Sequence, residues 1–289
     1  MDTARLKPLD RSQFPNAPRP HPPVRSSLVR VDRAMPRRGR AIAEKPIIAV
    51  KGLTIGWGDV VLQQDLNFEV KRGEVFGILG GSGAGKSTLL RFLIGLEQPI
   101  AGEIDVAGRG LPDLEAGLPP FGVMFQAGAL FGSLTVGENV ALPLEEWTDL
   151  PDDAVAAIAR AKLKLVGLDG AADKLPAELS GGMKKRAAIA RALALEPELV
   201  FLDEPSAGLD PVMAADLDEL ICTLSKTLGL TVVVVTHELE SIFRIADRII
   251  MLDKATKTII ATGDPRELKT SPDPRVSDFF NRKSKSKDS

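Results

Sequence analysis

The stretch that most constrains the fold is the glycine-rich segment GILGGSGAGKSTLL at residues 77–90. An apolar run, EVFGILG, leads into it, and apolar residues at helical spacing follow it, among them Leu89, Leu90 and Leu93. Glycine has no Cβ, so the backbone between these runs can turn sharply with its N–H groups pointing inward. The segment therefore predicts a buried strand, a tight loop and a helix, in that order.

The spacing G-x-x-x-x-G-K-S in this segment is that of a loop that binds the phosphates of a nucleoside triphosphate. Lys86 would reach the β- and γ-phosphates, and the Ser87 hydroxyl would bind Mg²⁺. The unpaired N–H groups and the positive dipole end of the following helix favour an anion. A flexible Gly-Ser turn is the alternative, but it requires no flanking strand and helix. We predict nucleotide contacts at Gly80, Gly81, Ser82, Gly83, Ala84, Gly85, Lys86, Ser87 and Thr88.

Two adjacent acids form the second chemical feature. Asp203 and Glu204 end the apolar run ELVFLDE, so a buried strand would deliver them at its C-terminal tip, where ligands of parallel sheets bind. Asp203 would hold Mg²⁺, directly or through water, and Glu204 would polarise the attacking water as a general base. Two solvated acids at a strand end are the alternative. The phosphate loop upstream favours the catalytic interpretation.

Strand-like and helix-like runs alternate along most of the chain. Strands are expected at 47–55, 60–70 and 74–80, which we expect to form a small sheet, and at 121–126, 199–204 and 231–237. Helices are expected over much of 133–197 and at 211–228 and 238–248. Strands that alternate with helices indicate a parallel sheet covered on both faces. The chain contains no internal repeat, so we expect one α/β domain of this kind.

Charge and composition separate the ends of the chain from its centre. Residues 1–45 contain eleven Lys or Arg, four Asp or Glu and seven Pro, which is typical of a disordered basic arm. An organellar transit peptide is the alternative, but the prolines would break its helix.

A single cysteine, Cys222, excludes a disulfide framework. No apolar run reaches the ~20 residues of a membrane span, so we expect a soluble protein that reaches a membrane only through a partner.

Together these segments resemble the ATP-binding subunit of an ABC transporter over about residues 47–265. LSGGM at 179–183 is similar to the signature motif of that family, and SAGLD at 206–210 to its D-loop. Gln126 falls at the position of the Q-loop glutamine, His237 at the switch histidine, and Trp57 at the aromatic residue that stacks on adenine. A hydrogen-bonded histidine at a strand end, and a tryptophan that only packs, are the alternatives for the last two.

The resemblance implies a fold, a cofactor and a dimer. It implies a P-loop NTPase fold over 46–265, with a RecA-like parallel-sheet core, a small antiparallel β subdomain and a helical subdomain at about 127–197, followed by a C-terminal extension at 266–289. It also implies that ATP and Mg²⁺ bind, and that Gln126 joins Ser87 and Asp203 at the metal and acts with Glu204 and His237 in hydrolysis. Two copies would bind head to tail, with Ser180, Gly181 and Gly182 of one contacting the ATP of the other. We expect the adjacent Lys184, Lys185 and Arg186 to be solvated surface charges.

Three details resemble the ATPases of Mla/Mce-type systems, which move phospholipids or other hydrophobic molecules across the cell envelope. They are Met183 in the signature, the segment 125–144 and DPRVSDFF at 273–280. This resemblance implies a peripheral protein on the cytoplasmic side of the inner membrane and a permease dimer that docks just after Gln126. The apolar Ala129, Leu130 and Phe131 suit such a docking groove, and a place in the buried core is the alternative for them. An Mce-domain substrate-binding protein and a STAS-domain subunit are further implied partners, and no specific nucleic acid is. A different cargo, such as amino acids or drugs, is the alternative; a soluble ABC ATPase of DNA repair or translation is a weaker one.

Overall fold

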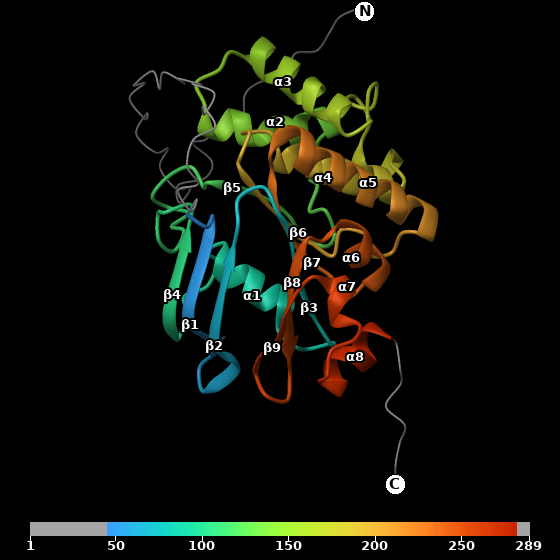
Figure 1. The fold of residues 1–289 in the computed structure, drawn as a ribbon. Helices are drawn as coiled ribbons and strands as arrows, with labels where there is room; N and C mark the ends of the chain where they lie inside the picture. Colours follow the sequence, from blue (N-terminus) through green and yellow to red (C-terminus); the bar gives the residue numbers. More distant parts are fainter. Residues whose placement is uncertain (1–44, 282–289) are drawn as a thin grey trace, which may run out of the picture. The chain divides into compact units, whose positions relative to one another are not determined.

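A computed structural model describes residues 45–281 (Figure 1). The expected basic arm, apart from Lys45, and the end of the expected C-terminal extension, 282–289, lie outside the described residues. No helix between residues 45 and 281 is long and apolar enough to cross a bilayer.

The larger of two sheets has six strands in the order β5-β6-β7-β3-β8-β9. All neighbours are parallel except β8 and β9, which pair antiparallel. Every residue of β3, β6 and β7 is buried, as continuous apolar runs predict for strands covered on both faces. The strands are β3 (Val75–Gly80), β5 (Phe121–Met124), β6 (Leu199–Asp203), β7 (Thr231–Val235), β8 (Arg248–Asp253) and β9 (Thr258–Gly263).

Side chains alternate between the two faces of this sheet and so fill two separate cores. In β6, Val200 and Leu202 pack into the core that also contains residues of α2, α3, α4 and α5, whereas Leu199 and Phe201 pack with α1. Figure 1 shows α1 and the group of α2 to α5 on opposite sides of the strands. The helices are α1 (Lys86–Leu93), α2 (Val136–Trp147), α3 (Asp152–Leu165), α4 (Gly181–Ala192), α5 (Pro211–Leu228), α6 (Leu239–Ile245), α7 (Pro265–Leu268) and α8 (Pro274–Phe280).

The smaller sheet is antiparallel, with the order β2-β1-β4, where β1 is Ile48–Trp57, β2 is Val60–Val70 and β4 is Ala101–Val106. The expectation that 74–80 would join it was wrong. That run forms β3, whose complete burial suits a central parallel strand. β4, which alternates exposed and buried positions only at its end, was missed because it lacks a long apolar run.

The helix expected at 238–248 is also shorter than predicted. α6 ends at Ile245, and Arg248 begins β8, in which the four residues 249–252 are all buried. An apolar run of that length suits a core strand better than the exposed end of a helix. With these corrections the fold belongs to the α/β class, with a mainly parallel sheet, a small antiparallel sheet and a group of helices.

Candidate functional site

The loop between β3 and α1 takes its shape from three glycines. Gly80, Gly83 and Gly85 have φ angles of 150°, 75° and 84°, a region that side chains rarely tolerate. A Cβ on Gly80 would also lie 2.6 Å from the carbonyl oxygen of Leu252 in β8. The chain then turns directly into α1 at Lys86, with no acidic residue in the first turn of that helix. The predicted residues from Gly80 to Thr88 thus form one continuous turn at the C-terminal end of a central strand.

Lys86 lies over this turn. Its Nζ donates to the carbonyl oxygens of Gly80 at 3.0 Å and Gly81 at 3.3 Å. Burial lowers the pKa of Lys86, while the charges of Glu204 and Asp203 act in the opposite direction. A half-buried ammonium above a glycine turn and a helix N-terminus is a fitting site for phosphate.

Ser87 and Asp203 meet on the other side of the turn, although they come from different elements. The Ser87 hydroxyl donates to Oδ1 of Asp203 over 3.0 Å. Burial raises the pKa of the Asp203 carboxyl, and the hydrogen bond from Ser87 opposes that shift. Within residues 45–281, no group of three or more His, Cys, Asp or Glu is arranged to hold a metal ion by itself. Two hard oxygen donors beside a phosphate site suit Mg²⁺, which keeps several of its waters.

Hydrogen bonds fix both the backbone and the side chain of Glu204. Its φ is 48°, its N–H donates to the Val235 carbonyl at 2.8 Å, and its Oε2 accepts from the Thr236 hydroxyl at 3.1 Å. Oε1 lies 2.8 Å from Nδ1 of His237, whose own side chain is 56% exposed. The structure therefore brings Glu204 and His237 together at the tips of the adjacent strands β6 and β7, next to Asp203.

Gln126 and Trp57 are less tightly placed. The Gln126 side chain is exposed, and the contact that the structure gives it runs through its backbone carbonyl. Trp57 is the last residue of β1; it is 49% exposed and precedes the two-residue turn Gly58–Asp59. No hydrogen bond or ion pair among residues 45–281 joins either side chain to Asp203, Glu204 or the phosphate loop.

Lys185 corrects an expectation. It is buried, 8% exposed, and not a solvated surface charge. Its Nζ donates to the carbonyl oxygen of Gln126 and, at 3.1 Å, to that of Glu204. Arg186 also binds backbone, donating to the carbonyls of Val166 and Asp216. A run of basic residues predicts an exposed segment. Only the tertiary fold shows which residue of the run points into the protein.

Ser180, Gly181 and Gly182 form the start of α4. Ser180 is the N-cap, and its side-chain oxygen accepts from the Met183 N–H at 3.2 Å. A Cβ on Gly182 would lie 2.9 Å from the Met213 side chain, so α4 begins against the start of α5. No hydrogen bond in the described part of the chain connects these three residues to the phosphate loop.

Gln63 was missed by sequence reasoning. It is fully buried in β2, and its Nε2 donates to the Ala84 carbonyl at 2.9 Å and the Asp253 carbonyl at 3.0 Å. Its Oε1 has no hydrogen-bond partner. Because C=O and N–H of a trans peptide point in opposite directions, holding the Ala84 carbonyl also orients the Gly85 N–H. The local sequence carried no signal for it, because regular alternation with the buried Leu66, Phe68 and Val70 would place Gln64 and not Gln63 on the inward side.

We expect Gln63→Glu to be strongly destabilising. The new carboxyl would place an oxygen against two carbonyl oxygens in a buried site, which costs on the order of 3 kcal/mol or more of unfolding free energy. Gln64→Glu is the matched control, because Gln64 is exposed on the same strand. Urea unfolding of both variants measures the difference. Equal stability of the two would show that the hydrogen bonds of Gln63 contribute little.

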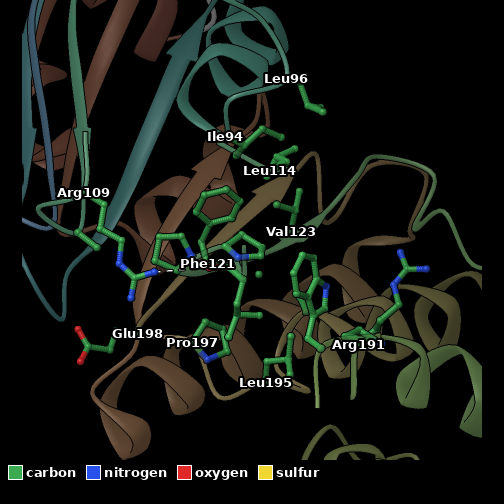
Figure 2. A pocket seen from close by; sticks show the side chains of 18 of the residues that line it. Ile94, Leu96, Arg109, Leu114, Phe121, Val123, Arg191, Leu195, Pro197 and Glu198 are labelled. Atoms are coloured by element: carbon green, nitrogen blue, oxygen red, sulfur yellow. Dashed lines mark hydrogen bonds between the residues drawn. The ribbon is translucent and has the colours of Figure 1, made fainter. Parts of the chain in front are cut away.

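A cleft of about 700 Å³ lies along β5 and the segment that leads into β6, and it is lined by none of the phosphate-loop residues and by neither Asp203 nor Glu204. Figure 2 shows its apolar wall, which includes Ile94, Leu96 and Phe121, with Arg109 and Arg191 at its sides. Phe125, next to Gln126, also lines it. The residues predicted for docking, Ala129, Leu130 and Phe131, do not line it: Leu130 packs against the core and Phe131 is 57% exposed.

Arg191 connects the cleft with the loop after Gln126. Its guanidinium donates to the carbonyl oxygens of Ala129 at 2.7 Å and Gly128 at 2.9 Å. Burial lowers the pKa of Arg191. A molecule bound in the cleft would therefore contact a side chain that holds this loop.

Comparison with known proteins gives one family and a consistent set of relatives. The family model described as ABC transporter matches residues 63–207. The intermembrane phospholipid transport system ATP-binding protein MlaF of Haemophilus influenzae is 41% identical over 81% of this chain and 90% of its own length. The probable ribonucleotide transport ATP-binding protein mkl of Mycobacterium leprae is also 41% identical, over 81% of this chain and 68% of its own.

Solved structures agree with the sequence comparison. A dimeric ATP-binding cassette in a post-hydrolysis state, bound to ADP and phosphate, is 30% identical with a TM-score of 0.67, covering 75% of this chain and 98% of that one. The cbiO1 protein of Clostridium perfringens, part of an ABC transporter complex, is 30% identical with a TM-score of 0.70, covering 83% and 96%.

Proposed function

The chain belongs to the family of ABC transporter ATP-binding proteins, and we propose that the transporter it drives moves phospholipid or another hydrophobic compound across the cell envelope. As a member of that family it binds ATP with Mg²⁺ and hydrolyses the ATP to drive transport. The observation that carries the cargo proposal is the 40–41% identity to MlaF proteins, which this chain covers over 88–90% of their length.

The residues of the phosphate loop bind the nucleotide in this proposal. The turned backbone from Gly80 to Gly85 presents N–H groups to the phosphates, and the Lys86 ammonium exchanges its two carbonyl contacts for phosphate oxygens. Bound Mg²⁺ would neutralise charge on the phosphates, and Ser87, Asp203 and Gln126 are the residues that would hold it. Trp57, exposed at the end of β1, offers its ring to the adenine.

Glu204 acts as the general base. Its carboxylate accepts the proton of the attacking water, and His237 and Thr236 hold the carboxylate oxygens in place. The exposed side chain of Gln126 turns toward the metal when the nucleotide binds. Ser180, Gly181 and Gly182 contact the nucleotide of a second copy, which accounts for their separation from the phosphate loop of their own chain. Dimers of solved cassettes with this fold support that arrangement.

The cleft beside Gln126 is where a membrane-embedded permease docks. Its apolar floor and its arginines fit a cytoplasmic permease segment with apolar and acidic side chains, and Arg191 passes the contact to the loop after Gln126. The protein then lies on the cytoplasmic side of the inner membrane, in a complex with two permease subunits. An Mce-domain protein and a STAS-domain subunit would complete that complex.

Ribonucleotide cargo is the second candidate, favoured by the 41% identity to a protein named as a probable ribonucleotide transport subunit. The two candidates differ in what the complete complex retains, since cargo contacts are made by the permease and its binding protein. The ATPase site described above would serve both.

Copurification of the native complex tests the cargo. We expect a tagged chain to retain a permease and an Mce-domain protein, with phospholipid in the extract and no enrichment of nucleosides. Leu96→Glu, which places a charge on the apolar wall of the cleft, should lose the permease while the isolated chain keeps its affinity for ATP. Leu228→Glu, at an exposed position that does not line the cleft, should retain the permease. A periplasmic amino-acid binder among the retained proteins would contradict the proposal.

A further inference from the structure

Lys185 is the only lysine among the described residues that is buried. It lies in the second turn of α4, on the side of the helix that faces β6 and the loop after β5. Burial lowers its pKa, and the charges of Glu204 and Asp203 act in the opposite direction. Burying an ammonium costs free energy unless it is paired or hydrogen-bonded. The two carbonyl groups that accept from Lys185 are therefore the groups that it positions.

The first partner is the backbone of Glu204. A non-glycine residue with a φ of 48° is strained by about 1–3 kcal/mol and persists only where the surroundings fix it. The N–H and side chain of Glu204 have partners in Val235, Thr236 and His237. Its carbonyl oxygen accepts from the Lys185 ammonium at 3.1 Å and, within its own turn, from the Ala207 N–H at 3.3 Å. Lys185 is the donor from outside that turn, so its loss removes the contact that fixes the peptide after Glu204 on the α4 side.

The second partner is the backbone of Gln126. α4 holds this loop at three points, because Lys185 donates to the carbonyl of Gln126 and Arg191 donates to those of Gly128 and Ala129. Gly128 also packs on the helix: a Cβ there would lie 3.5 Å from Ala188. The same helix begins at Ser180, Gly181 and Gly182, so a shift of α4 would move the Gln126 loop and the Glu204 carbonyl together.

We propose that Lys185 is a positioning residue that holds the Gln126 loop and the Glu204 backbone in the arrangement required for hydrolysis. This inference rests on the proposed role of Glu204 as general base. Lys185 touches neither nucleotide nor water; it acts through the two carbonyl groups. Its loss should therefore slow the chemical step and leave nucleotide binding in place.

Lys185→Met in the full chain tests this, with Lys184→Met as the matched control. Lys184 carries the same charge one residue earlier, and its side chain makes no hydrogen bond or ion pair with the described residues. We expect kcat of Lys185→Met to fall by about 10- to 100-fold, because small misplacements of a catalytic group have effects of that size. KM and the Kd for a fluorescent ATP analogue should stay within about twofold, and Lys184→Met should match the wild type.

A second readout does not depend on turnover. Amide hydrogen exchange of residues 125–131 in the nucleotide-free protein should become about tenfold faster or more in Lys185→Met, because the loop loses one of its anchors. Lys185→Arg should restore both kcat and protection, since a guanidinium can donate to both carbonyls.

Three results would overturn the proposal: unchanged kcat and exchange in Lys185→Met, an equal loss in Lys184→Met, or a loss explained by weaker ATP binding. If Lys185→Met does not fold, Lys185→Gln replaces it; a folded Lys185→Gln with wild-type kcat would also contradict the need for an ammonium. The role of Lys185 can fail without the other proposals failing. Glu204→Gln tests separately whether Glu204 is the general base, and copurification tests the cargo.

Discussion

Glu204→Gln should keep ATP binding, reduce hydrolysis to background and hold two copies together as a stable dimer. The amide has the shape of the carboxylate but cannot accept a proton from water, and loss of a general base lowers kcat by about 10²- to 10⁴-fold. The Thr236 and His237 contacts, 3.1 and 2.8 Å from the carboxylate oxygens, should keep the new side chain in place. Because the uncleaved nucleotide would continue to link the copies, Mg²⁺-ATP should shift the protein to a dimer in light scattering.

Glu145→Gln is the control for this experiment, because it makes the same charge change at an exposed position of α2. It should hydrolyse ATP like the wild type and should not accumulate as a dimer. A Glu204→Gln protein that turns over at a normal rate would show that water is activated by another group. A protein that remains monomeric at saturating ATP would contradict the shared site instead.

Short-range sequence patterns were enough to predict the centre of the site. A glycine loop between an apolar strand and an apolar helix allows few structures, and the run LVFLDE places Asp203 at a strand tip whatever lies around it. The Ser87–Asp203 hydrogen bond, 3.0 Å long, follows from two such local predictions meeting at one end of a parallel sheet. The order of the strands within the sheets was not available from the same patterns, and β3 was therefore assigned to the wrong sheet.

Residues that act through tertiary contacts were not predictable in this way. Lys185 stands in a basic run and Gln63 beside another glutamine, so nothing in the local sequence separates either from its less buried neighbour. The difference lies in the carbonyl groups that the fold brings within hydrogen-bond distance. For Lys185 these are the carbonyls of Gln126 and Glu204, and for Gln63 those of Ala84 and Asp253. The cleft had no local signal either, since its walls come from the segment after α1, from α2 and α4, and from β5 with the segment before it.

Lys86→Ala should lose nucleotide affinity itself. In the structure the ammonium bridges the carbonyls of Gly80 and Gly81, and in the proposed complex it binds phosphate oxygens instead. Charge-assisted hydrogen bonds contribute about 1.5–3 kcal/mol each, so loss of two should weaken ATP binding by about 100-fold or more. Equilibrium titration with a fluorescent ATP analogue measures this directly, and the ATP-induced dimer should fail to form at concentrations that saturate the wild type.

The result expected for Lys86→Ala differs from those expected for Glu204→Gln and Lys185→Met. Comparing the three variants therefore tests the role given to each residue. Glu204→Gln should bind ATP and not cleave it, Lys185→Met should bind ATP and cleave it slowly, and Lys86→Ala should bind ATP about 100-fold or more weakly. Lys51→Ala, at an exposed position of β1, controls for removal of a lysine. Since Lys86 bonds only to backbone in the structure, Lys86→Ala should fold, and the circular dichroism spectrum checks this. Wild-type affinity in a folded Lys86→Ala would mean that the phosphates bind elsewhere, and the glycine turn would lose its proposed role.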